Sequence, residues 1–393
     1  MDRSRDSILT RIMIAAGEAS GDLHGSNLVR VALSFNPDLK FYGIGGEKLK
    51  AAGVDLYFDL EHQGLFGLTE IVTSLRNTLR ILRTLKKSLH EEKPAALVLI
   101  DYPDFNLSLA KTAKRLGIPV FYYISPQIWA WRRGRVKKIK RFVDRMAVVF
   151  PFEVDFYQQY GLEVSFVGHP LLDVMTPPRP KAEVKVELGF DPSRPLLALL
   201  PGSRLTEIRQ HLALMLECAF EARRQRPDLS LAVAQADTFK DGDLAPFLED
   251  GPDKVKLVIG RTHLLQNAAD VVLTASGTAT LETALMLTPM VVIYRVRPLT
   301  HFFIKRLAKV DYVALANLIA RERLVPELLQ KEARPDRITA ELMRLLNEPE
   351  SRVKMIEGLR RVREKLGAPG GSQRAARLLL ETMKKEPDQA YNK

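Results

Sequence analysis

The stretch RIMIAAGEASGDLHG, residues 11–25, is typical of one recurring structural unit. Its apolar residues 12–16 predict a short buried strand, and the glycines and polar residues that follow predict a tight turn opening into a helix. A strand followed by a turn and a helix is the repeating unit of a parallel α/β sheet. The turn carries Glu18, Ser20 and Asp22 at a helix start, where free N–H groups suit an anionic or polar substrate. The alternative is a purely structural turn, with Ser20 or Asp22 as helix cap.

The same alternation continues along the chain on both sides of a proline-rich break. Apolar runs predict strands at 40–44, 96–101, 120–125, 146–150 and 164–167, and then at 195–200, 229–234, 255–259, 271–275 and 290–294. The sequence MTPPRP at 175–180 cannot lie inside a sheet. From about residue 335 the pattern is helical only. We expect an α/β fold with two Rossmann-like, doubly wound domains facing a central cleft, followed by C-terminal helices.

The expected domains are residues 1–170, 171–345 and 346–393. The terminal helices would pack back on the first domain, or on a partner chain in a homodimer. The chain has 393 residues, 46% of them hydrophobic, which is enough for two ordinary cores.

Charge and targeting signals restrict the function classes. The formal net charge is +12, which suits nucleic acid, an anionic membrane surface or phosphorylated substrates. The single cysteine excludes an intramolecular disulfide framework. No stretch of about 18 apolar residues occurs, so we expect a cytoplasmic protein without a transmembrane helix.

Asp101 is the candidate general base. It follows the predicted strand at 96–101 in the sequence IDYPDFN, where a carboxylate at the carboxyl end of a strand projects toward a ligand. Asp104 is better placed to cap the helix that follows. Structural capping by both aspartates is the alternative.

Both tryptophans of the chain, Trp129 and Trp131, directly precede a basic segment that begins at Arg132 and Arg133. Amphipathic tryptophans beside a cationic helix suit an anionic membrane interface. They also suit base stacking with phosphate contacts. A solvated basic face over an apolar stripe is the third interpretation. The basic helix near residues 76–87 is a second cationic surface.

Two turns of the second half are predicted to bind a nucleotide. Gly202, Ser203 and Arg204 follow one strand and combine backbone donors, a hydroxyl and a cation, as a diphosphate site requires. Another strand is followed by a helix start with Ser276, Gly277, Thr278 and Glu282, whose carboxylate suits ribose hydroxyls. Each turn alone is equally explained as a capped helix start. A nucleotide spanning both turns explains them together.

Metal and cofactor signals are missing from the sequence. The seven histidines show no metal-ligand spacing, and His169 is better explained as a hydrogen-bonded hinge residue. No acidic pair of the DxD type stands in a loop. We therefore expect neither a metal nor a cofactor.

Taken together, the motifs resemble the lipid-A-disaccharide synthase family. The resemblance runs from about residue 11 to 380 and rests on nine blocks in order: AGEASGDLHG at 16–25, GLTEIV at 67–72, IDYPDFN at 100–106, SPQIWAWRRGRVKKI at 125–139, FVGHPLLD at 166–173, LLPGSR at 199–204, ASGTATLE at 275–282, MVVIYRV at 290–296 and DYVALANLIARERLVPELLQ at 311–330.

This resemblance implies a GT-B glycosyltransferase of lipid A and lipopolysaccharide biosynthesis. In such an enzyme residues 1–170 would face the acceptor and the membrane, and residues 171–345 would bind the UDP-sugar. The implied reaction joins UDP-2,3-diacylglucosamine to 2,3-diacylglucosamine 1-phosphate with inversion, giving a β-1,6 disaccharide 1-phosphate and UDP. Asp101 would be the base, and Asn317 and Arg321 would bind substrate. The resemblance also implies that the protein is peripherally bound to the surface of the inner membrane.

Two other function classes stay open at this point. A UDP-sugar 2-epimerase of the same fold would convert its UDP-sugar without releasing a disaccharide. A nucleic-acid-binding protein would show tight, salt-sensitive binding of RNA or DNA. The nine ordered blocks favour the glycosyltransferase and argue against nucleic acid as the partner.

Overall fold

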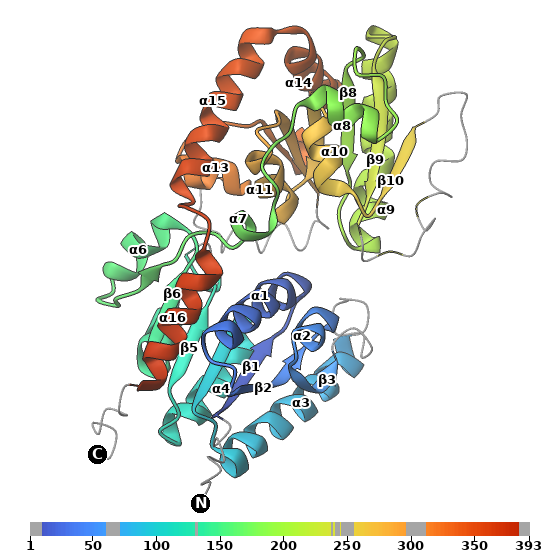
Figure 1. The fold of residues 1–393 in the computed structure, drawn as a ribbon. Coiled ribbons are helices and arrows are strands. Elements are labelled where there is room, and N and C mark those ends of the chain that lie inside the picture. The colour runs from blue at the N-terminus through green and yellow to red at the C-terminus, as the bar shows by residue number, and fades with distance from the viewer. Residues whose placement is uncertain are drawn as a thin grey trace, which may run out of the picture. The chain divides into compact units, whose positions relative to one another are not determined.

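The computed structural model describes residues 10–59, 71–129, 133–236, 239, 244, 255–295 and 312–384. The chain divides into two compact units. Unit 1 comprises residues 1–173 and 367–393, and unit 2 comprises residues 174–366. Each unit is an α/β sheet with helices on its faces (Figure 1).

Unit 1 is built on a parallel sheet of seven strands. They are β1 (Thr10–Ala16), β2 (Leu39–Gly45), β3 (Asp55–Asp59), β4 (Ala96–Ile100), β5 (Val120–Tyr123), β6 (Arg145–Val148) and β7 (Ser165–Phe166). Their order is β3-β2-β1-β4-β5-β6-β7. The order therefore reverses between β1 and β4, and ligands of such sheets bind beyond the carboxyl ends of the strands at this point.

The helices of unit 1 follow its strands in the expected alternation. They are α1 (Ala19–Phe35), α2 (Glu47–Ala51), α3 (Ile71–Glu92), α4 (Pro103–Arg115), η1 (Arg133–Arg135), α5 (Val136–Phe142) and α6 (Pro151–Gln158), with α7 (Leu171–Val174) at the junction of the units. The central strands are buried on both faces because helices cover both sides. All five residues of β4 are buried, as expected for a parallel sheet.

The last helix, α16 (Gly371–Lys384), completes unit 1 and packs on α1 and on strands β4, β5 and β6 (Figure 1). Asp173 caps this helix from almost two hundred residues away. Its carboxylate accepts the backbone N–H groups of Gly371 and Ser372, at 3.2 and 2.8 Å. Arg374 also donates to the carbonyl oxygen of Val167 at 2.7 Å. The C-terminal segment is thus bound by side chains at its start.

Unit 2 repeats the architecture with six strands. They are β8 (Leu196–Leu200), β9 (Ser230–Gln235), β10 (Lys256–Ile259), β11 (Val271–Ala275), β12 (Met290–Tyr294) and β13 (Glu327–Leu329). The order is β10-β9-β8-β11-β12-β13, and all neighbouring strands run parallel. Here the order reverses between β8 and β11, so the turns after these two strands mark the corresponding ligand position.

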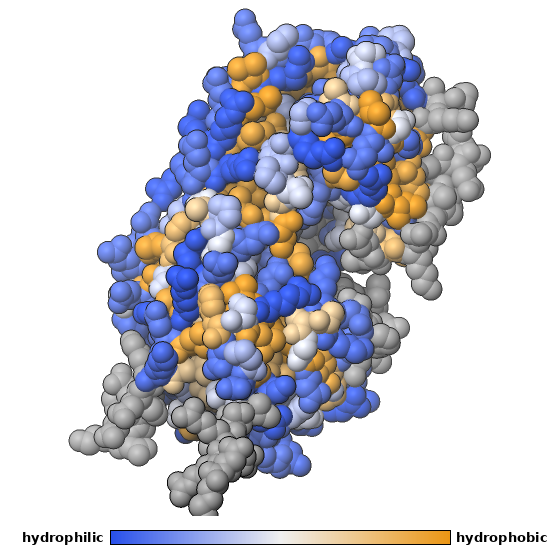
Figure 2. Space-filling model, viewed as in Figure 1, coloured by the Kyte–Doolittle hydropathy of each residue, from blue (hydrophilic) through white to orange (hydrophobic). Residues whose placement is uncertain are grey.

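The helices of unit 2 are α8 (Lys181–Glu187), α9 (Leu205–Gln225), α10 (Thr262–Ala268), α11 (Thr278–Leu285), α13 (Leu315–Ala320), η3 (Gln330–Glu332), α14 (Pro335–Asn347) and α15 (Pro349–Lys365). Apolar residues of β8, β11 and β12 form the centre of one hydrophobic core, and α9, α14 and α15 cover it. The exposed side of α15 is mostly hydrophilic on the face shown in Figure 2.

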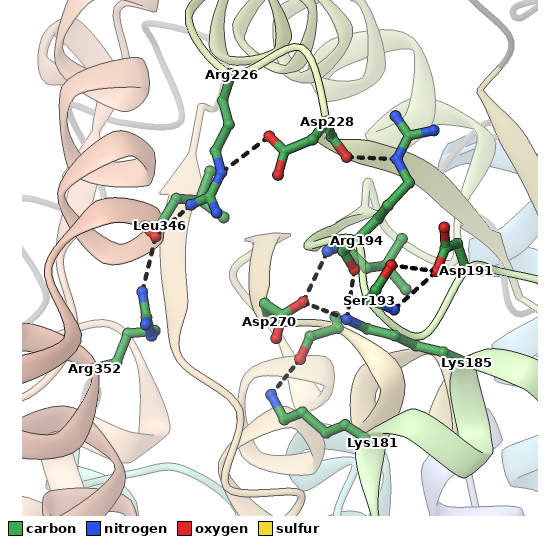
Figure 3. A network of polar contacts seen from close by, with 12 residues as sticks. Lys181, Lys185, Asp191, Ser193, Arg194, Arg226, Asp228, Asp270, Leu346 and Arg352 are labelled. Carbon is green, nitrogen blue, oxygen red and sulfur yellow. Dashed lines mark hydrogen bonds and ion pairs between the residues drawn. The ribbon is translucent and has the colours of Figure 1, made fainter.

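A network of charged groups fixes α8 at the amino-terminal edge of the sheet of unit 2 (Figure 3). The ammonium of Lys185 donates to Asp270 at 2.8 Å and to the carbonyl oxygen of Arg194 at 2.7 Å. Asp270 also accepts the N–H of Leu196, the first residue of β8, at 2.8 Å. Because Lys185 is buried, its charge requires these partners. This edge lies opposite the carboxyl ends of the strands.

The predicted α/β class is confirmed. Two strands were not predicted: β3, at an edge of its sheet, and β13, which has only three residues. Residues 346–393, expected as one group of helices, are divided, since α15 belongs to unit 2 and α16 to unit 1. Among the helices of the described ranges, none has the length and apolar character needed to cross a membrane.

Candidate functional site

Asp101 and Glu18 lie at the point of unit 1 where the strand order reverses. Asp101 directly follows β4, and Glu18 follows β1 by two residues; the two strands are hydrogen-bonded neighbours, with Ala16 opposite Ile100. Burial, together with the negative charge of Glu18, raises the pKa of Asp101 to about 7. A carboxylate with such a pKa is suited to accept a proton near neutral pH.

The backbone at Asp101 is held in an unusual conformation. Asp101 and Tyr102 both have positive φ angles, 45° and 46°, which side-chain-bearing residues rarely adopt. The side-chain amide of Asn106 donates to the carbonyl oxygens of Ile100 and Asp101, at 3.0 and 2.7 Å. The buried phenol of Tyr122 donates to the same Asp101 oxygen. Positive φ angles held by surrounding hydrogen bonds are frequent at functional sites.

Asp22 has a structural role instead of the expected substrate-facing one. It is buried, and its carboxylate accepts the N–H groups of Gly46, Lys48 and Leu49 at 2.8 to 3.1 Å. It therefore caps α2, a helix 24 residues further along the chain. The alternative of a purely structural turn therefore applies to Asp22, although Asp22 caps α2 and not α1, the helix that this turn opens. Ser20, by contrast, is exposed at the start of α1.

Trp129 does not face a membrane, which corrects the prediction. The side chain is buried, with 6% of its surface exposed. Its indole Nε1 donates to Glu153 at 3.2 Å, and its ring packs edge-on against Phe152. A tryptophan next to a basic run can therefore belong to the core. Trp131 and Arg132 lie outside the described residues, as does the side chain of Arg133.

The basic segment is linked to the turn after β4. Arg135, at the end of η1, is buried and forms an ion pair with Asp104 in the first turn of α4. Asp104 thus contacts a side chain of the basic segment in addition to its place at a helix start. The pair ties the segment to the turn that carries Asp101.

In unit 2, the turn after β8 presents Ser203 and Arg204 to solvent. Gly202 has a φ of +128°, and a Cβ atom there would lie 2.6 Å from the Cβ of Glu207, so only glycine fits. The carboxylate of Glu207 accepts the N–H groups of Ser203 and Arg204, at 2.9 and 3.3 Å. The two backbone donors predicted for a diphosphate are therefore occupied by Glu207. The guanidinium of Arg204 is the exposed cation of this turn.

The turn after β11, the neighbouring strand, carries Ser276, Gly277 and Thr278. Gly277 and Thr278 are exposed at the N-terminus of α11, where the first N–H groups of a helix lack partners from a preceding turn. Glu282, one turn later, is largely buried and lies 3.6 Å from the imidazole of His263. The arrangement offers hydrogen-bond donors at a positive helix end.

Asn317 is a structural residue, which corrects its predicted role in substrate binding. It is fully buried, and its amide donates to the carbonyl oxygen of Val325 and to Glu327, at 2.9 and 2.7 Å. Glu327 in turn accepts the N–H groups of Val313 and Ala314. Asn317 thus fastens the segment before β13. Arg321 is exposed and ends α13 with a positive φ of 63°.

Comparison with known proteins identifies the family. Residues 12–380 match the family model described as lipid-A-disaccharide synthetase. The chain is 48% identical over 376 residues to the lipid-A-disaccharide synthase of Geobacter metallireducens, covering 96% of this chain and 98% of that one. The chain belongs to the lipid-A-disaccharide synthase family. It is accordingly a glycosyltransferase of lipid A disaccharide synthesis, which uses a nucleotide-sugar donor and an acceptor.

Solved structures show the fold of this synthase family member to be GT-B. A UDP-GlcNAc 2-epimerase from Neisseria meningitidis bound to UDP-GlcNAc superposes with a TM-score of 0.65 at 12% identity, over 95% of this chain and 100% of that one. The calicheamicin glycosyltransferase CalG4 superposes with a TM-score of 0.62 at 16% identity, over 96% and 98%. Both likenesses concern the fold alone. The predicted GT-B architecture is confirmed.

Three residues that support the synthase site were not predicted from sequence. Tyr102, Asn106 and Glu207 each stand within six residues of a predicted residue. The motif IDYPDFN contains the first two, and the amide side chain of Asn106 between the apolar Phe105 and Leu107 is the available signal. Within the described ranges, no group of three His, Cys, Asp or Glu side chains gathers to hold a metal ion.

Proposed function

We propose that this synthase joins UDP-2,3-diacylglucosamine to 2,3-diacylglucosamine 1-phosphate, with inversion, to form the β-1,6 disaccharide 1-phosphate and UDP. The observation that carries the proposal is the partly buried carboxylate of Asp101, whose pKa is raised to about 7, at the strand-order reversal of unit 1. Family membership supplies the reaction class. An inverting displacement requires one base for the acceptor hydroxyl, and Asp101 provides one.

On the acceptor side, Asp101 accepts the proton of the 6-hydroxyl group. The hydroxyl oxygen then attacks the anomeric carbon of the donor from the face opposite UDP, and the bond between that carbon and the UDP oxygen breaks. The proton stays on Asp101 until solvent removes it, and UDP leaves with the bond electrons. Glu18 favours this proton transfer because its negative charge raises the pKa of Asp101.

On the donor side, unit 2 would bind the uridine diphosphate. The N–H groups at the start of α11 and the guanidinium of Arg204 together stabilise the negative charge of the leaving diphosphate. Glu282 accepts hydrogen bonds from the ribose hydroxyls. The adjacency of β8 and β11, whose turns carry these groups, supports a single nucleotide contacting both. Glu207 must share or release the amides of Ser203 and Arg204 if they also bind phosphate.

The test is a two-substrate incubation with mass analysis of the products. We expect disaccharide 1-phosphate and UDP in equal amounts, and the anomeric configuration of the new bond reports inversion. Asp101→Ala should lower turnover by at least tenfold. A wild-type chain that converts a UDP-sugar alone and forms no disaccharide would instead indicate a 2-epimerase. Turnover of Asp101→Ala within tenfold of wild type would exclude Asp101 as the base.

We further propose that unit 1 docks on the cytoplasmic face of the inner membrane through α3, α4 and α5. Helix α3 contacts α4, and α4 contacts α5, so their basic residues belong to one region. Burial lowers the pKa of Lys86 on α3, and the charges of Lys111 and Arg115 on α4 lower it further. On α5, Lys137, Lys138 and Arg141 are exposed. An anionic lipid surface attracts such a cluster.

Vesicle sedimentation tests this docking. The triple substitution of Lys137, Lys138 and Arg141 by Gln should lower binding to anionic vesicles several-fold, at about 1 kcal/mol per charge near the surface. The matched control replaces three exposed basic residues of unit 2, Lys331, Lys354 and Arg360, by Gln. If both variants lose the same share of vesicle binding, the binding depends on net charge alone. That result would contradict a docking surface on unit 1.

A further inference from the structure

The backbone of the proposed base is held on both sides of its Cα atom. The N–H group of Asp101 donates to the carbonyl oxygen of Ile124 at 3.3 Å, which extends the pairing of β4 with β5. The carbonyl oxygen of Asp101 accepts the side-chain amide of Asn106 at 2.7 Å and the phenol of Tyr122. Because the two peptide groups beside this Cα are both held, the direction in which the Asp101 side chain leaves the backbone is set by the fold.

Asn106 binds a backbone conformation that side-chain-bearing residues rarely adopt. In an extended strand, successive carbonyl groups point to opposite sides. The amide nitrogen of Asn106 nevertheless donates to the carbonyl oxygens of two successive residues, Ile100 at 3.0 Å and Asp101 at 2.7 Å. The chain leaves the strand here, with positive φ angles of 45° at Asp101 and 46° at Tyr102. The hydrogen bonds from Asn106 therefore offset the strain of this turn.

The position of Asn106 in α4 is unfavourable for an amide unless the amide has partners. The residue is fully buried, and its neighbours Phe105 and Leu107 are buried as well. Leucine is a better helix former than asparagine, and a buried amide without hydrogen bonds is costly. The amide donates to two carbonyl oxygens of residues 100–102, here called the base turn. Because full burial keeps Asn106 away from substrate, it can act on the reaction only through this turn.

We infer that Asn106 is a positioning residue of this synthase, which directs the carboxylate of Asp101 toward the acceptor hydroxyl by holding the base turn. Tyr122 assists, since its phenol donates to the same oxygen. The inference rests on the proposed function, in which Asp101 is the base. A misplacement of about 1 Å at a reacting group can cost about 100-fold in rate. A relaxed base turn should therefore slow the chemical step and leave substrate binding little changed.

The experiment compares kcat, both KM values and the pH dependence of kcat/KM in wild type and Asn106→Leu. Leucine removes both hydrogen bonds at nearly constant volume, and we expect kcat to fall by about 100-fold with each KM nearly unchanged. The acid limb of kcat/KM should move to lower pH, because a released Asp101 side chain is better hydrated and burial is the main cause of its raised pKa. Tyr122→Phe should lower kcat by about fivefold, the contribution of one hydrogen bond. It carries the test if Asn106→Leu does not fold.

Asn267→Leu is the matched control. Asn267 is a buried amide of unit 2 that donates to the carbonyl oxygen of Arg179 at 3.0 Å and accepts the N–H of the same residue at 2.8 Å. The substitution also removes two buried hydrogen bonds to the backbone, but Asn267 lies near the end of α10, outside the turns proposed to bind substrates. We expect Asn267→Leu to lower stability and to leave kcat and the acid limb unchanged.

The outcomes separate this inference from the proposed function. No disaccharide from the wild-type chain, or turnover of Asp101→Ala within about tenfold of wild type, would overturn the proposed function and the inference with it. An inactive Asp101→Ala together with wild-type kcat in Asn106→Leu, or in Tyr122→Phe if the former does not fold, would overturn the inference alone. Equal losses of kcat in Asn106→Leu and Asn267→Leu would do the same. A lower kcat with a shifted acid limb in Asn106→Leu alone would establish the positioning role.

Discussion

The indole Nε1 of Trp129 donates a hydrogen bond to the carboxylate of Glu153 at 3.2 Å. The same carboxylate accepts the N–H groups of Val149 and Phe150, at 3.2 and 3.0 Å, where α6 begins. Burial raises the pKa of Glu153 to about 7. The pair therefore joins the loop after β5 to the loop after β6 inside unit 1. Trp129 anchors this loop within the protein.

The fluorescence of Trp129 tests that assignment. Trp131→Phe leaves Trp129 as the sole tryptophan, because the chain has only two. We expect blue-shifted emission that iodide quenches weakly and that anionic vesicles leave unchanged, since the ring is buried. A shift of the emission on adding anionic vesicles would instead indicate that Trp129 contacts the membrane surface. The converse variant, Trp129→Phe, should lose about 1–3 kcal/mol of stability because Glu153 loses a buried partner.

The acid limb of the rate profile should report Asp101. A general base must be deprotonated, so kcat/KM should fall as the pH drops below about 7, the pKa to which burial and Glu18 raise this carboxyl. Glu18→Gln removes the negative charge and should move the limb to lower pH. The measurement is kcat/KM between pH 5 and 9 for both proteins, at constant ionic strength. If the acid limb of kcat/KM lies at the same pH in Glu18→Gln and in wild type, Glu18 does not change the pKa of Asp101.

Asp101→Asn should be inactive yet more stable than wild type at alkaline pH. The folded pKa of Asp101, about 7, exceeds the ordinary aspartate pKa of 3.8, so the folded state binds more protons than the unfolded state between these values. The carboxyl group therefore costs stability as the pH rises through this window, at up to about 1.4 kcal/mol per pH unit. Asn avoids the charge and tolerates a positive φ. Urea unfolding at pH 8 and pH 4 should show a gain for Asp101→Asn at pH 8 only.

Arg204 should contribute to nucleotide affinity, and Arg209 should not. Both are exposed on or beside α9, but Arg204 stands in the turn after β8 and Arg209 one turn into the helix. Removing one cation from a diphosphate site costs about 1.5–3 kcal/mol, so Arg204→Ala should raise the Kd of UDP by roughly 10- to 100-fold. Calorimetric titration with UDP measures both variants. Equal affinity of Arg204→Ala and Arg209→Ala would contradict the proposed diphosphate site.

His169 should make the protein sensitive to acid. Burial, together with the charge of His24, lowers its pKa to about 3. The unfolded chain binds a proton at about pH 6.5, so the contribution of neutral His169 to stability is lost progressively as the pH falls from 6.5 toward 3. His169→Asn keeps an acceptor for the N–H of Leu171, which now bonds His169 Nδ1 at 3.2 Å. Its unfolding free energy should depend less on pH across this window.

The features predictable from sequence are those that depend on neighbouring residues. Short apolar runs predict the central strands, and the turns that follow these strands carry Asp101, Arg204 and Ser276. These positions follow from local order alone, because the carboxyl ends of parallel strands meet at one edge. Strand β13, which pairs with β12, has only three residues. A run this short is not long enough for a periodic pattern to predict a strand.

The roles that sequence could not predict depend on distant partners. Asp22 binds amides 24 to 27 residues away, Trp129 binds Glu153 24 residues away, and Asn317 binds Glu327. Each is polar or amphipathic and stands in one of the quoted motifs, so the sequence alone favours a binding role. Burial distinguishes the two roles, and burial is a property of the packed fold. Asp101, by contrast, is only partly buried, and it stands at the strand-order reversal with no capping role.

The cap of α16 by Asp173 has a consequence for how the chain is made. Unit 2 is one continuous stretch, residues 174–366, whereas unit 1 needs residues from both ends of the chain. When unit 2 has left the ribosome, α16, the helix that covers α1 and strands β4 to β6, has not yet emerged. During synthesis the apolar surface beneath α16 therefore stays exposed until residues 371–384 emerge. Nascent unit 1 is the stage at which we expect chaperones to bind and truncation to cause aggregation.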